Sequence, residues 1–95
     1  MREAVTPNET AEARLKRIRM RAWRRGTREM DLVLGPYADA RLAGLDDAAL
    51  DGLDRLLGEN DQDLYQWVSG QRPPPAQFVA LIAEIGSFAR ARLAL

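Results

Sequence analysis

Cysteine and histidine are both absent from this chain of 95 residues. The lack of cysteine excludes disulfides and thiolate metal sites. The lack of histidine excludes a histidine ligand for zinc, a Ser-His triad and a histidine general base, and no covalent histidyl–cofactor bond can form on this chain. The side chains that remain for catalysis are carboxylates, Lys16, Ser69 and Ser87. None of the last three has a second catalytic residue type at a spacing that indicates an active site. We therefore expect a protein that is not an enzyme.

Long apolar runs are missing as well. No stretch approaches the roughly 18 apolar residues that a membrane-spanning helix needs, so we expect no membrane insertion. Residues 1–8 lack the basic start and apolar stretch of a secretion signal, and we interpret them as a flexible segment before a single domain at 9–95. Because missing cysteine fits a reducing compartment, these features together predict a cytoplasmic protein, monomeric when free.

Charge is balanced overall but separated along the chain. The sequence has 14 basic and 14 acidic residues and no formal net charge. Eight basic residues and no acidic one lie between Arg14 and Arg28, whereas ten acidic and two basic residues lie between Glu29 and Asp63. A block of one sign repels itself, and a partner of the opposite sign relieves the repulsion. We therefore interpret the basic block as a partner surface.

Apolar residues recur at three- and four-residue spacing, as on the buried face of a helix, and no stretch alternates as a β-strand does. The pattern predicts an all-α, compact five-helix bundle, with helices at about 9–24, 27–42, 46–57, 61–68 and 75–93. Thr6-Pro7-Asn8-Glu9 has the form of a capping box, Ala11 is expected on the apolar side of the first helix, and Asp46 is expected to cap the third. Pro36 lies inside the second helix, which predicts a kink or two shorter pieces.

The short fourth helix carries Tyr65 and Trp67 among acidic residues. We expect Trp67 to pack in the core, whereas Tyr65 could expose its hydroxyl to a partner. The acidic residues around this helix are expected at helix caps and on solvated faces. No metal site is expected among them, because no loop shows the alternating ligands and central glycine of a calcium site.

The segment from Arg24 to Asp31 admits two interpretations. Local capping accounts for every residue type in it, because Arg24 and Arg25 meet the negative end of one helix dipole, Glu29 meets the positive end of the next, and Gly26 permits the turn. In the second interpretation, the same residues form an exposed contact site that carries both positive and negative charge. Arginine binds a carboxylate or phosphate in a bidentate fork, and glutamate accepts hydrogen bonds from a partner's donors.

Two sequence blocks carry a family resemblance. The run Arg24-Arg25-Gly26-x-x-Glu29-x-Asp31-Leu32-x-Leu34 resembles the RGxxE motif of the SdhE family of flavinylation factors, which assist the assembly of succinate dehydrogenase. The run Leu57-x-x-x-Asp61-x-Asp63-Leu64-Tyr65-x-Trp67 is similar to a second block of that family. RGxxE alone is a weak pattern, but two blocks at family-like spacing are much more specific. Tyr37 departs from the family, where phenylalanine is common at this place.

The resemblance implies a chaperone that binds the flavoprotein subunit of succinate dehydrogenase and promotes covalent attachment of FAD to a histidine of that subunit, with fumarate reductase as an open second client. It implies that the contact residues are Arg25, Gly26 and Glu29, and we expect these further residues beside them: Arg21, Arg24, Arg28, Asp31 and Tyr65. FAD is then the client's cofactor. We expect no tightly bound cofactor on this chain, since it has no glycine-rich nucleotide loop.

A function of another class stays open, that of a small helical regulator that binds nucleic acid. In that interpretation the basic helix from Arg14 to Arg28 follows a phosphate backbone. The sequence pI of about 6.2 and the acidic remainder of the chain argue against it.

Overall fold

The computed structural model describes residues 9–93, which form five α-helices and two short 3₁₀ turns. The elements are α1 (Ala11–Trp23), α2 (Arg28–Arg41), η1 (Leu42–Gly44), α3 (Asp47–Leu56), α4 (Asp61–Ser69), η2 (Ala76–Phe78) and α5 (Val79–Leu93). No strand occurs within 9–93, so the all-α prediction is confirmed. None of the helices in this range combines the length and apolar character that crossing a bilayer requires.

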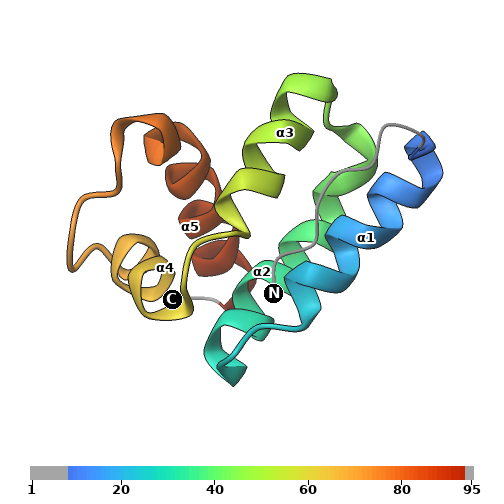
Figure 1. Ribbon diagram of the computed structural model, residues 1–95. Coiled ribbons are helices and arrows are strands. Elements are labelled where there is room, and N and C mark those ends of the chain that lie inside the picture. Colours follow the sequence, from blue (N-terminus) through green and yellow to red (C-terminus); the bar gives the residue numbers. More distant parts are fainter. Residues whose placement is uncertain (1–8, 94–95) are drawn as a thin grey trace.

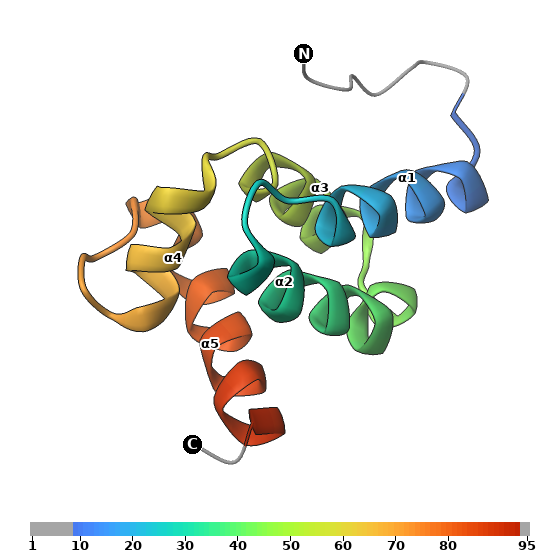
Figure 2. The ribbon, with the colours of Figure 1, turned by 90° about the horizontal axis from the view of Figure 1, so that it is seen from below.

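The helix α2 packs against helices on two sides. It lies beside α1, to which a short turn at 24–27 joins it, and it also contacts α4 and α5 (Figure 1). Figure 2 shows α1 and α2 side by side at one end of the molecule and α4 with α5 at the other. All five helices contribute to one core, whose fully buried large side chains include Ile18, Met30, Leu34, Tyr37, Leu53, Leu56, Leu64 and Ile85.

Short polar side chains begin the first four α-helices. Each N-cap accepts a hydrogen bond from the backbone N–H three residues further on, and the four caps are Thr10, Thr27, Asp46 and Asn60. The prediction for Asp46 is confirmed. The predicted start at Glu9 is wrong, because Thr10 caps α1 and the helix begins at Ala11; of the predicted capping box, residues 6–8 lie outside the described residues. Ala11 is exposed rather than apolar-facing, since it lies in the first turn of α1, far from the end that joins α2.

Helix α2 continues through Pro36 from Arg28 to Arg41, so the expectation of two shorter pieces is wrong. Proline lacks the N–H that would bond to the carbonyl of Leu32, so the helix passes through Pro36 with one backbone hydrogen bond fewer. The preceding residue, Gly35, is fixed by packing, because a Cβ there would stand 2.3 Å from the indole ring of Trp23 on α1. The ring of Trp23 therefore rests directly on the backbone of α2.

Tyr37 is fully buried in α2, and its hydroxyl has a partner on α5. The hydroxyl donates a hydrogen bond of 2.6 Å to Oε2 of Glu84, and the ring meets Phe88 edge-on at 5.7 Å between centroids. Burial raises the pKa of the Tyr37 hydroxyl, and the bond to Glu84 raises it further. Glu84 thus satisfies the hydroxyl of this buried tyrosine.

Candidate functional site

A single carboxylate, that of Asp61, links the two sequence blocks. It accepts hydrogen bonds from Nε of Arg25 at 2.7 Å, from the backbone N–H of Gly26, and from the backbone N–H of Thr27 at 3.1 Å. Asp61 is the first residue of α4, where the positive end of the helix dipole also stabilises its charge. The acids of this region were expected at helix caps and on solvated faces; Asp61 lies at a helix start, but only 11% of its side chain is exposed, so it is not on a solvated face.

Arg25 is turned inward rather than presented to a partner. Its side chain is 9% exposed, and its two terminal nitrogens donate to the carbonyls of Leu57 and Glu59, each at 2.8 Å. These carbonyls follow the end of α3, where helix geometry leaves such groups without internal partners. The backbone N–H of Arg25 donates to Oδ1 of Asp31 at 2.6 Å. The expectation of an exposed arginine is therefore wrong: Arg25 ties the turn at 24–27 to the α3–α4 connection.

The close approach of the Asp61 carboxylate leaves little room for a side chain at Gly26. A Cβ at this position would lie 2.9 Å from Oδ2 of Asp61, the atom to which the Gly26 N–H donates. Within 9–93, the glycine with a positive φ is Gly70, which ends α4 at φ 84°, and Gly26 is not in that region. A methyl group at Gly26 would therefore displace the carboxylate that fixes the turn.

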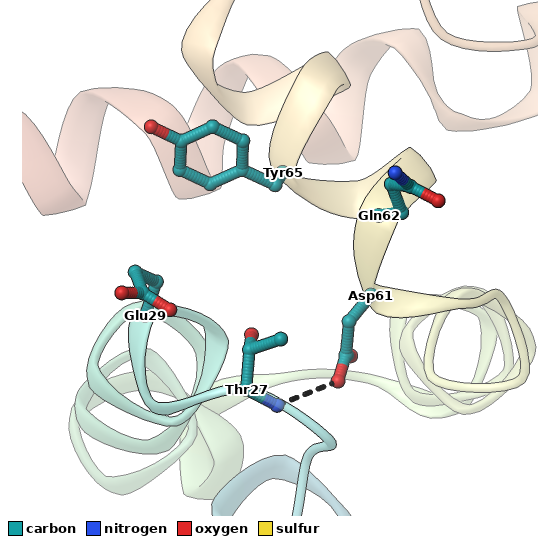
Figure 3. Close-up of a pocket in the computed structure, with 5 residues that line it drawn as sticks. All are labelled: Thr27, Glu29, Asp61, Gln62 and Tyr65. Atoms are coloured by element: carbon teal, nitrogen blue, oxygen red, sulfur yellow. Dashed lines mark hydrogen bonds between the residues drawn. The ribbon is translucent and has the colours of Figure 1, made fainter.

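Beside this turn, residues of α2 and α4 line an open surface hollow of about 530 Å³. Figure 3 shows its walls: Thr27 and Glu29 lie on the α2 side, and Asp61, Gln62 and Tyr65 on the α4 side. Glu29 is exposed, and no residue within 9–93 forms an ion pair or hydrogen bond with it. Tyr65 is 46% exposed. The hollow therefore presents an unpaired carboxylate and the side of a phenol ring, which together suit a hydrogen-bond donor or a cation.

The basic block of α1 is largely neutralised within the chain. Three arginines of α1 reach α3 through ion pairs: Arg14 with Asp47 and Asp51, Arg17 with Asp54, and Arg21 with Asp54. Arg17 also pairs with Glu9 at 2.7 Å, and Arg19 pairs with Asp39 of α2 at 3.4 Å. For these residues the interpretation of the block as a partner surface is wrong, because acids of the same chain relieve its repulsion.

Asp54 is the centre of this ion-pair cluster, at 2.7 Å from Nη2 of Arg17 and 2.6 Å from Nη1 of Arg21. Burial by itself raises the pKa of Asp54, but the hydrogen bonds and charge of Arg17, joined by those of Arg21, outweigh it and hold the pKa below its ordinary value. Hydrogen bonds to Asp54 and Glu9 raise the pKa of Arg17 in return. Each of the two partners, Arg17 and Asp54, therefore stabilises the charged form of the other.

A family profile described as the flavinator of succinate dehydrogenase matches residues 16–89. The chain belongs to this family. It is 38% identical over 78 residues, 82% of this chain, to "Succinate dehydrogenase assembly factor 2, mitochondrial" of Mycosarcoma maydis, and covers 33% of that protein. Proteins of the same name are 33% identical over 81 residues in Drosophila grimshawi, covering 83% of this chain and 55% of that protein, and 30% identical over 86 residues in Schizosaccharomyces pombe, covering 88% and 62%. This chain thus spans between a third and about three fifths of the length of these relatives.

In this member of the flavinator family the residues predicted for the site separate into groups. Glu29 and Tyr65 line the hollow. Three others, Arg25, Gly26 and Asp31, hold the turn from inside. Arg21 belongs to the ion-pair cluster, whereas Arg24 and Arg28 are exposed.

Sequence reasoning missed Asp61, Thr27 and Gln62 as site residues. A signal for Asp61 was present, because Asn60 already caps α4 and leaves the next carboxylate free for other donors.

Proposed function

We propose that this chain is an assembly factor that binds the flavoprotein subunit of succinate dehydrogenase and promotes covalent attachment of FAD to a histidine of that subunit. Membership of the flavinator family supports the link to succinate dehydrogenase. Since the chain has no histidine, the acceptor of the flavin belongs to the client, and FAD is the client's cofactor. The flavoprotein of fumarate reductase is a second client of the same chemistry.

The observation that carries this proposal is the fixed turn beside the hollow. Asp61 and Arg25 are both nearly buried and hold the turn between two helices, so the position of Glu29 at the start of α2 is set before a partner arrives. A preorganised contact loses less conformational entropy on binding than a mobile one. Glu29 and Tyr65 remain unengaged and accessible, as contact residues must be.

The proposed action is that of a chaperone rather than an enzyme. The carboxylate of Glu29 and the polar groups of Gln62 and Tyr65 in the hollow suit hydrogen bonding to a partner. By holding one conformation of the flavoprotein, the factor brings the client's histidine and FAD into reacting geometry. Such ordering can lower a barrier by several kcal/mol, up to about 7–11. The redox chemistry remains that of the flavin itself.

The test is co-expression with the flavoprotein subunit, with covalent flavin scored by in-gel fluorescence after denaturation. Glu29→Gln removes the charge and keeps the shape, and we expect about tenfold weaker complex formation with less covalent flavin. Glu12→Gln is the matched control, because Glu12 is also an exposed carboxylate in the first turn of a helix. If the two variants support flavinylation equally, Glu29 is not a contact and the proposal for this site fails.

Nucleic acid is not proposed as a partner, because most of the basic block is paired with acids of the same chain. The names of the relatives place those proteins in mitochondria. A cytoplasmic location for this chain stays a prediction, which cell fractionation followed by detection of the chain would test.

A further inference from the structure

The ion pairs among residues 9–93 involve some of the basic residues between Arg14 and Arg28 and leave the others without an acidic partner in that range. Of its eight basic residues, five pair with acids: Arg14, Arg17, Arg19, Arg21 and Arg25. The other three, Lys16, Arg24 and Arg28, are exposed, and no residue within 9–93 pairs with them. Unpaired cations repel one another and favour an acidic neighbour.

These three cations share a face with exposed apolar side chains. One side of α1 carries Lys16, Met20 and Trp23, which follow one another at four- and three-residue spacing. One side of α2 carries Arg28 and Leu32, which are four residues apart. Met20, Trp23 and Leu32 are between 39% and 44% exposed. We call this set the hairpin face; its members are Lys16, Met20, Trp23, Arg24, Arg28 and Leu32.

The hairpin face is continuous across the two helices. The indole ring of Trp23 lies on Gly35 of α2, and its Nε1 donates to Oδ2 of Asp39 at 3.2 Å. Asp39 is also paired with Arg19, so the acid at the edge of the face is already engaged. Figure 2 shows the two helices lying side by side over this length. The surface therefore spans both helices and is partly apolar and positively charged.

We propose that the hairpin face docks an acidic segment of the client protein that carries aromatic or aliphatic side chains. Three unpaired cations complement carboxylates, and the exposed indole and aliphatic groups gain by burial against apolar side chains. A nucleic acid is disfavoured, because three cations on a chain of zero formal net charge give a short electrostatic footprint.

The hairpin face lies beside the site proposed to contact the client. Trp23 and Arg24 directly precede Arg25, and Arg28 directly precedes Glu29, so the hairpin face and the hollow adjoin the same turn. A partner that contacts Glu29 can also contact the hairpin face, because both adjoin the same turn. This inference rests on the proposed function, because its occupant is a segment of the same flavoprotein.

The experiment measures the affinity of the purified flavoprotein subunit for the full chain by isothermal titration calorimetry at several salt concentrations. Leu32→Ser removes an exposed apolar group, and we expect at least about fivefold weaker binding. The double variant Lys16→Glu/Arg28→Glu reverses two unpaired cations, and we expect about tenfold weaker binding with a flatter salt dependence. Two matched controls leave binding unchanged: Val79→Ser for the apolar change and Arg90→Glu for the charge change, both at exposed positions of α5.

The outcomes distinguish a failure of this inference from a failure of the proposed function. If the unmodified chain does not bind the flavoprotein, the proposed function and the docking face both fail. If it binds and is weakened by Glu29→Gln, but the hairpin-face variants bind like the α5 controls, the docking face alone is overturned. Retention of duplex DNA at about 150 mM salt, lost in Lys16→Glu/Arg28→Glu, would also overturn it in favour of a nucleic-acid partner.

Discussion

Replacing Asp61 by asparagine tests whether one carboxylate fixes the turn at 24–27. Asparagine keeps the shape of the side chain, but it has no charge and one of its two oxygens becomes an N–H donor. That donor would then face the Nε of Arg25 or the N–H groups of Gly26 and Thr27, which are donors themselves. Asp61→Asn therefore loses acceptor capacity and leaves a nearly buried guanidinium without its counter-charge.

The size of the effect follows from the burial of the pair. Removing one partner of a buried ion pair costs about 3–5 kcal/mol. Arg25 keeps the carbonyls of Leu57 and Glu59 as acceptors, so we expect the lower limit, about 3 kcal/mol. A domain of this size unfolds with roughly 5–14 kcal/mol, so the variant stays folded at room temperature. The corresponding fall in Tm is about 12–24 °C.

Thermal and urea denaturation followed by far-UV circular dichroism measure this loss. Asp63→Asn is the control, because Asp63 and Arg72 form an ion pair of similar length, 2.8 Å, at the surface, where such pairs contribute at most about 1 kcal/mol. A double-mutant cycle with Arg25→Met isolates the coupling between Arg25 and Asp61, expected at about 1–3 kcal/mol. If Asp61→Asn costs no more stability than Asp63→Asn, the turn is held by other contacts and the reasoning is refuted.

Two further predictions concern the α1–α3 cluster and the α1–α2 packing. Because the pKa of Asp54 is lower in the folded chain than in the unfolded one, its stabilisation is present above about pH 4 and is lost as pH falls through the folded pKa. Asp54→Asn should therefore cost about 2 kcal/mol or more at pH 7, since it removes the carboxylate that Arg17 and Arg21 share and leaves Arg17 with Glu9 alone. It should also flatten the fall in urea midpoint towards about pH 3; an unchanged acid profile would contradict this. Gly35→Ala should destabilise the chain by about 1–3 kcal/mol and red-shift the emission of Trp23, because the added methyl displaces its ring. Gly52→Ala, in open space on α3, should instead stabilise it by about 0.5–1 kcal/mol, and equal effects of the two alanines in thermal melts would refute the packing argument.

Local sequence signals predicted the helices because their causes are local. Apolar spacing placed all five helices to within a few residues, and Asp46 marks the start of α3 as expected. The start of α1 was misplaced because Thr6 and Thr10 are both suitable N-caps. Glu9 pairs with Arg17 instead of entering the helix, a contact that depends on tertiary structure.

The site was predicted less well because burial of charge depends on partners distant in sequence. A sequence places Arg25 at a helix end, where arginine is usually exposed, and it does not reveal that two backbone carbonyls after α3 accept its hydrogen bonds. The basic block was misinterpreted for the same reason, since nothing in residues 14–28 indicates that the acids of α3 lie opposite. The side chains of the predicted set that kept their expected exposure belong to Arg24, Arg28, Glu29 and Tyr65.

The bond between Asp61 and the turn also has a consequence for how the protein folds. The α1–α2 hairpin is a local structure that can form early, but the carboxylate that shapes its turn lies 35 residues beyond Gly26 and arrives only when α4 docks. The contact surface around Glu29 is therefore complete only once α4 has docked. A partly folded or truncated chain would contain the RGxxE sequence without its functional shape, so client binding would report that the whole chain has reached its native state.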